Sequence, residues 1–75
     1  MVRMSLWTVY DHPTDFPNNY VAREWVVEDG RLGPTGNFML ANDVEIIREI
    51  LLVQMHLHRL PRNENDDPKI VETWI

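Results

Sequence analysis

Two histidines one residue apart, His56 and His58, are the side chains of this sequence best suited to binding a metal ion. On a β-strand both imidazoles would lie on the same side, which is a common half of a zinc or copper site. A third ligand would have to come from His12, Asp11 or Asp15 in an earlier loop. The pattern is also typical of two solvent-facing histidines, and we favour that interpretation because nothing fixes the geometry. We therefore predict no metal and no other cofactor.

The loop sequence D-H-P-T-D, residues 11–15, is the best candidate for acid–base chemistry. His12 could pair with Asp15 or Glu24, because an imidazole and a carboxylate are common general acids and bases. The same composition is typical of a turn, in which Asp side chains bond local N–H groups and proline stiffens the chain. Nucleophilic catalysis has little support, since cysteine is absent and Ser5, the single serine, has no nucleophile elbow around it. We predict no catalytic residue and a protein that is not an enzyme.

A polar, acidic loop is expected after Pro61. Asn63, Asn65 and Asp67 have the spacing of the first three calcium ligands of an EF-hand. The positions that require Gly and Glu hold Pro68 and Trp74, so we interpret the segment as an acidic loop without a calcium site.

Aromatic side chains are concentrated in the segments that we expect to be strands, and the candidates for an interaction surface are Trp7, Tyr10, Trp25 and Trp74. On a basic sheet such residues would suggest stacking of nucleic-acid bases. The net charge of −5 argues against nucleic acid, because phosphate binding depends on Lys and Arg. Both faces of the expected first strand carry bulky groups, and one helix covers only one face. We therefore expect a protein partner, with a homodimer as one possibility.

The length of 75 residues predicts a single domain, residues 1–75, near the lower size limit for a stable core. Cysteine is absent, which excludes disulfides and thiolate metal sites. No apolar run approaches the roughly 20 residues that span a membrane, and the first residues lack the apolar segment of a signal peptide. The expected location is the cytoplasm, without membrane binding.

The densest aliphatic run, residues 39–60, predicts the helix around which the chain packs. Asn42 is the expected N-cap, with Glu45 completing a capping box. The end is ambiguous, because the segment Met55–Leu60 could continue the helix or form a strand with alternating apolar residues and histidines. We favour a helix of about three turns that ends near Gln54, followed by a strand.

Alternating apolar residues predict three further strands: Leu6–Tyr10, Tyr20–Glu28 and Lys69–Ile75. Asp29-Gly30 is a typical tight turn. The next segment, R-L-G-P-T-G-N, is expected to be irregular, with a short edge strand at Phe38–Leu40. The main elements follow the order β-β-α-β-β. This order predicts an α+β fold in which one helix packs on a face of a small antiparallel sheet.

The strings W-T-V-Y-D-H-P-T-D-F-P-N-N-Y-V-A-R and L-P-R-N-E-N-D-D-P-K-I-V-E-T-W-I, near the two ends of the chain, support a resemblance. They resemble the ends of a family of short bacterial proteins, often prophage-associated, that share Y-D-H-P and D-D-P-x-I-V-E-x-W and have no assigned function. The resemblance covers about half of the chain and implies no site residues. Family members turn sharply after the helix at Pro or Gly, where this chain has V-Q-M.

Together these observations predict a non-enzymatic protein-interaction module. It would associate with itself or with a partner through an aromatic sheet face or an edge strand. The alternative is a small-ligand, metal-binding or catalytic module built around His12 and the pair His56 and His58.

Overall fold

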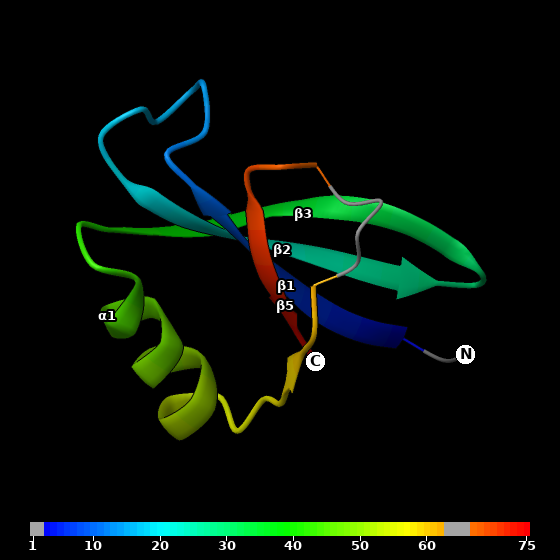
Figure 1. The fold of residues 1–75 in the computed structure, drawn as a ribbon. Coiled ribbons are helices and arrows are strands. Elements are labelled where there is room, and N and C mark those ends of the chain that lie inside the picture. The colour runs from blue at the N-terminus through cyan, green and yellow to red at the C-terminus, as the bar shows by residue number, and fades with distance from the viewer. Residues whose placement is uncertain (1–2, 63–66) are drawn as a thin grey trace.

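The computed structural model describes residues 3–62 and 67–75, and in these residues it shows a five-stranded antiparallel sheet with one helix against a face (Figure 1). The elements are β1 (Arg3–Asp11), β2 (Tyr20–Glu28), β3 (Arg31–Ala41), α1 (Val44–Glu49), η1 (Ile50–Gln54), β4 (Arg59–Leu60) and β5 (Ile70–Trp74). The strand order across the sheet is β3-β2-β1-β5-β4. The α+β class is confirmed, with three strands rather than two before the helix. Asn63 and Asn65 of the expected acidic loop lie outside the described residues.

The first two strands form the long hairpin that the sequence predicts. Their register runs without interruption from Arg3 opposite Glu28 to Asp11 opposite Tyr20. The turn into β3 is made by Asp29 and Gly30, whose φ angles of 52° and 78° are both positive. Positive φ at both central residues is the requirement of a type I′ hairpin turn, which matches the twist of the flanking strands.

The expectation of an irregular segment after this turn is wrong, because β3 extends through all of it. Pro34 is tolerated since β3 is an edge strand, where a missing N–H does not break the ladder. The register between β2 and β3 shifts between Arg23 and Trp25, and Gly36, with a φ of 87°, lies opposite this shift. The extra residues are therefore accommodated as a bulge within one continuous strand.

The helix begins one residue later than predicted. Asp43, not Asn42, is the N-cap, and its carboxylate accepts the backbone N–H of Glu45 at 2.9 Å. Asn42 instead accepts a hydrogen bond from the Asn19 side chain at 3.3 Å, so a contact with the loop before β2 decides between two good capping residues. The helix then widens into the π-helix η1 and ends at Gln54, as expected.

The strand expected at Met55–Leu60 is mostly absent, since only Arg59 and Leu60 pair with β5. His56 has a φ of 56° and ends the helix as a left-handed cap. The Leu57 N–H then donates to the Leu51 carbonyl at 2.9 Å. His56 thus occupies the position that glycine commonly fills after a helix. Its left-handed conformation lets the chain turn sharply after Met55 although neither proline nor glycine is present at this point.

Replacing His56 by glycine is expected to raise the free energy of unfolding by up to about 1 kcal/mol, because glycine adopts a positive φ without a Cβ penalty. His58→Gly is the matched control and should lower stability, since His58 has no positive φ and glycine loses more chain entropy on folding. Urea titration of both variants measures the difference. A lower stability for His56→Gly would contradict the strained cap.

The core lies between the helix and one face of the sheet. Its buried members are Trp7, Val9, Ala22, Ile47, Leu51 and Trp74. The strand register explains which sheet residues belong to the core. Trp7 pairs with Trp74 and Val9 pairs with Ala22, so all four side chains point to the helix. Seven hydrophobic side chains of the described residues are buried, against ten large ones that are exposed. A small core of this kind leaves much apolar surface in contact with water.

Candidate functional site

The side of the sheet opposite the helix carries a second set of apolar side chains, which we call the open face. By strand register it consists of Met4, Leu6, Thr8, Tyr10, Val21, Arg23, Trp25, Val27, Leu32, Phe38 and Leu40. The largest exposed fractions are 62% for Leu32, 49% for Phe38 and 47% for Met4. Met4, Val27 and Leu32 form one row across three strands, and Leu6 and Trp25 form the next. Contiguous apolar surface of this kind usually marks an interface.

The loop between β1 and β2 covers one end of the open face. Phe16 packs on Phe38 with ring centroids 5.6 Å apart, and the Arg23 guanidinium lies 5.9 Å from the centroids of both Phe16 and Tyr10. Asp15 forms an ion pair with Arg23. Burial raises the pKa of the Tyr10 phenol, and the neighbouring Arg23 charge partly opposes this shift. The loop therefore closes the end near Tyr10, and none of these contacts covers the end near Met4 within the described part of the chain.

The four aromatic residues proposed for interaction fall on different sides of the sheet. Trp7 and Trp74 belong to the core, with exposed fractions of 6% and 4%, so they do not form part of the open face. Tyr10 and Trp25 do lie on it, and both are half-buried. The indole N–H of Trp25 is buried and has no hydrogen-bond acceptor among the described residues. The sequence did not indicate the residues that β3 adds to this face, which are Leu32, Phe38 and Leu40.

The expected acid–base loop forms different contacts from those considered. The imidazole of His12 bonds the adjacent Asp11 and packs edge-on against Tyr20, with ring centroids 4.9 Å apart. Asp15 is engaged by Arg23. Glu24 lies on the helix side of the sheet, where its partners are side chains of β3. The structure therefore brings His12 together with neither of its two expected carboxylate partners.

Glu24 is held by two hydrogen bonds across the β2–β3 bulge. Its carboxylate accepts from Asn37 at 3.0 Å and from Thr35 at 2.8 Å. These bonds stabilise the charged form and lower the pKa of the Glu24 carboxyl. The cluster stabilises the irregular part of β3.

The three histidines are not gathered into one site. Figure 1 shows the loop between β1 and β2 at the top of the view and the segment after the helix at the bottom. His56 is the helix cap, and the backbone of His58 pairs with Ile75 at 2.6 and 2.9 Å. Among residues 3–62 and 67–75, no group of three or more His, Asp or Glu side chains is placed to hold a metal ion.

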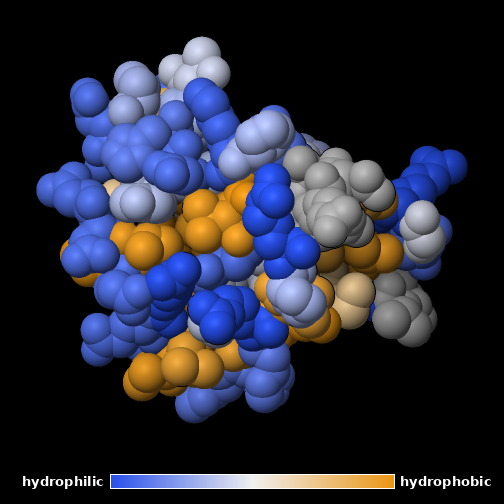
Figure 2. Space-filling model, in the orientation of Figure 1, coloured by the Kyte–Doolittle hydropathy of each residue, from blue (hydrophilic) through white to orange (hydrophobic). Residues whose placement is uncertain are grey.

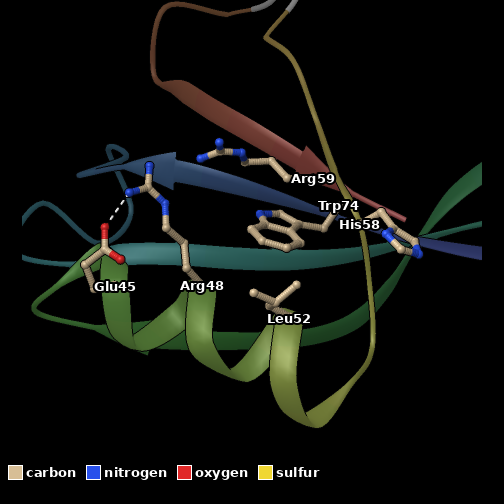
Figure 3. Close-up of a pocket in the computed structure, with 6 residues that line it drawn as sticks. All are labelled: Glu45, Arg48, Leu52, His58, Arg59 and Trp74. Atoms are coloured by element: carbon tan, nitrogen blue, oxygen red, sulfur yellow. Dashed lines mark hydrogen bonds and ion pairs between the residues drawn. The ribbon is translucent and has the colours of Figure 1, made fainter.

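A groove between the helix and the β5–β4 edge was not foreseen from the sequence. It has a volume of about 380 Å³ and is lined by Glu45, Arg48, Leu52, His58, Arg59 and Trp74. In Figure 3 the side chain of Arg59 extends across the Trp74 ring toward Arg48, Leu52 lies beneath the ring, and His58 points away. The groove thus combines an apolar floor with two guanidinium groups at its rim.

Arg48 is fixed in the groove by two carboxylates. Its Nη2 donates to Glu72 Oε1 at 2.8 Å, and its Nε approaches both oxygens of the same carboxylate at 3.1 and 3.2 Å. Glu45 takes a further bond, and Trp74 Nε1 donates to Glu72 at 2.6 Å. The bonds to Glu72 and Glu45 raise the pKa of the Arg48 guanidinium above its ordinary value. The buried Glu72 carboxylate therefore accepts hydrogen bonds from Arg48 of the helix and from Trp74 of its own strand.

Further apolar surface lies on the helix. Figure 2 shows hydrophobic groups at the lower left of the view, where Figure 1 places the last turn of the helix. Leu52 and Val53 belong to this turn and are 54% and 59% exposed. Within the described part of the chain, no helix has both the length and the apolar character to cross a membrane.

No family model matches this chain, and neither a curated protein nor a solved structure shows significant similarity to it. The resemblance of its two ends to short prophage-associated proteins therefore stays a prediction. The function has to be argued from the surfaces themselves.

Proposed function

We propose that this chain is a non-enzymatic cytoplasmic interaction module that forms a dimer with a second copy through the open face of its sheet. The observation that carries the proposal is the row of Met4, Val27 and Leu32, which continues into Leu6 and Trp25 on the side away from the helix. Apolar surface removed from water contributes about 25 cal/mol per Å², so burying this row favours association.

A second copy suits this surface because the surface is almost free of charge. Among the described residues of the open face, Arg23 and Tyr10 are the ionisable side chains, and Arg23 is already paired with Asp15. A two-fold contact places the same patch on both partners, so an uncharged apolar patch is complementary to itself. A partner selected by charge would need opposite charges that this face does not offer.

The edges of the sheet are less suited to association than its face. At one edge, β3 contains Pro34 and a bulge, which interrupt the row of backbone groups that an added strand would need. At the other edge, β4 has two residues and is followed by Pro61. We therefore favour burial of the face over addition of a strand.

The size of the face predicts a weak dimer. Three strands about 4.8 Å apart and about 30 Å long give on the order of 400 Å² per copy. Twice this area lies below the standard size of specific interfaces, in the range of weak complexes, so we expect a dissociation constant on the order of 100 micromolar or weaker. Each copy carries a net charge of −5, and salt should strengthen the dimer by screening this repulsion.

Sedimentation across a concentration series, at low and at high salt, tests the proposal. Leu32→Glu should give a monomer at all concentrations, because each copy would have to bury an unpaired carboxylate in the contact. Val53→Glu is the matched control, since Val53 is similarly exposed but lies on the helix, and this variant should still form the dimer. A wild-type chain that is monomeric throughout, or a dimer disrupted by Val53→Glu alone, would overturn the open-face proposal.

A further inference from the structure

We propose that the groove between the helix and the β5–β4 edge binds a small carboxylic acid with an apolar body. The groove lies on the helix side of the sheet, away from the open face, so the inference is independent of dimer formation. Its volume of about 380 Å³ lies within the range of small-molecule sites.

The donors at the rim are suited to an anion. Arg59 is exposed at the rim of the groove, and within residues 3–62 and 67–75 its guanidinium forms no ion pair. Arg48 has five N–H donors. Glu72 accepts from Nε and Nη2 and Glu45 accepts from Nη1, so two of the five are not used by any residue that the structure describes. In Figure 3 these two guanidinium groups converge on the same side of the Trp74 ring. A carboxylate can be bound bidentately by Arg59 with a further bond from Arg48.

The apolar floor of the groove indicates that the part of the ligand next to the carboxylate is also apolar. Trp74 presents its ring, and Leu52, which is 54% exposed, lies beneath it. Leu52 is part of the π-helix η1, and short π-helical segments occur frequently at functional sites. An aromatic or aliphatic group next to the carboxylate would cover both side chains.

The charges around the groove limit the ligand to a single negative charge. Two arginines, Arg48 and Arg59, are balanced by two carboxylates, Glu45 and Glu72. A phosphate dianion would meet about twice the repulsion from these carboxylates that a monocarboxylate meets, and the two arginines leave no net positive charge to offset it. The chemical class that fits is therefore an aryl or alkyl monocarboxylic acid.

Titration of the ¹⁵N-labelled chain with phenylacetate tests the site. We expect saturable shifts at the indole N–H of Trp74 and the amide of Leu52, with a dissociation constant on the order of 1 mM for so small a ligand. Phenylacetamide, the neutral analogue, and inorganic phosphate should each bind at least about tenfold more weakly. Shifts that do not saturate, or equal binding of acid and amide, would overturn the proposal, as would tighter binding of phosphate.

Two variants distinguish the contribution of Arg59 to binding from the effect of the net charge. Arg59→Gln should weaken phenylacetate binding about tenfold or more, because the bidentate partner is lost. Arg31→Gln changes the net charge equally on the exposed β3 edge and should leave binding unchanged. Leu32→Glu should also bind normally, which distinguishes this site from the dimer contact. Equal loss in both glutamine variants would show a nonspecific charge effect and reject the groove.

Discussion

Arg48→Met is expected to lower the free energy of unfolding by about 3 kcal/mol, because it leaves Glu72 charged, buried and without its main partner. Glu72 is only 4% exposed, and after the substitution the Trp74 indole N–H would be the one side-chain donor of the described residues that remains bonded to it. Methionine keeps most of the length of the arginine stem, so the loss should come from the charge rather than from a cavity. Unfolding in guanidinium chloride, monitored by tryptophan fluorescence, measures this loss of stability.

The double variant Arg48→Met with Glu72→Gln shows whether the cost is electrostatic. A neutral glutamine still accepts the Trp74 N–H through its amide oxygen and no longer needs a cation. We expect the double variant to be more stable than Arg48→Met alone by about 1–2 kcal/mol. If the effects of the two substitutions on the free energy of unfolding simply add, the carboxylate and the guanidinium are not coupled. The interpretation of this pair would then be wrong.

Leu51→Ala is expected to lower the free energy of unfolding by about 2–5 kcal/mol, since Leu51 is fully buried in the core and alanine leaves a cavity. Leu52→Ala, the same change one residue later, is the control. Leu52 is 54% exposed, so its loss should cost less than about 1 kcal/mol while changing helix propensity equally. Denaturant titration of both variants provides the comparison, and equal losses would contradict the orientation of η1.

The parts of the fold that follow from local patterning could be predicted from the sequence. The range Tyr20–Glu28 alternates regularly and ends at Asp29-Gly30, so both the strand and its turn are encoded locally. The first half of β3 is not encoded locally, because Gly33, Pro34 and Gly36 disfavour a strand in isolation. They form one only because β2 supplies a partner and the bulge absorbs the irregularity.

The candidate sites could be predicted only in part. Alternation shows that Trp7 and Val9 share a face, but it does not show which face the helix covers. The prediction that Trp7 and Trp74 lie on an interaction surface is therefore wrong, because the helix covers their face. The groove depends on contacts between distant positions, such as Arg48 with Glu72 and Arg59 opposite Trp74. No local pattern encodes these pairings, because they arise when β5 enters the sheet between β1 and β4.

The central place of β1 has a consequence for the order in which the strands can join the sheet during folding. One neighbour, β2, follows after a short loop, whereas the other, β5, contains Trp74 opposite Trp7. Contacts between positions so far apart slow folding, because a long loop must close before any contact compensates for its entropy. The meander β1–β3 can therefore form before β5 joins the sheet. The helix gains its complete packing surface only after residues 70–74 have paired with β1.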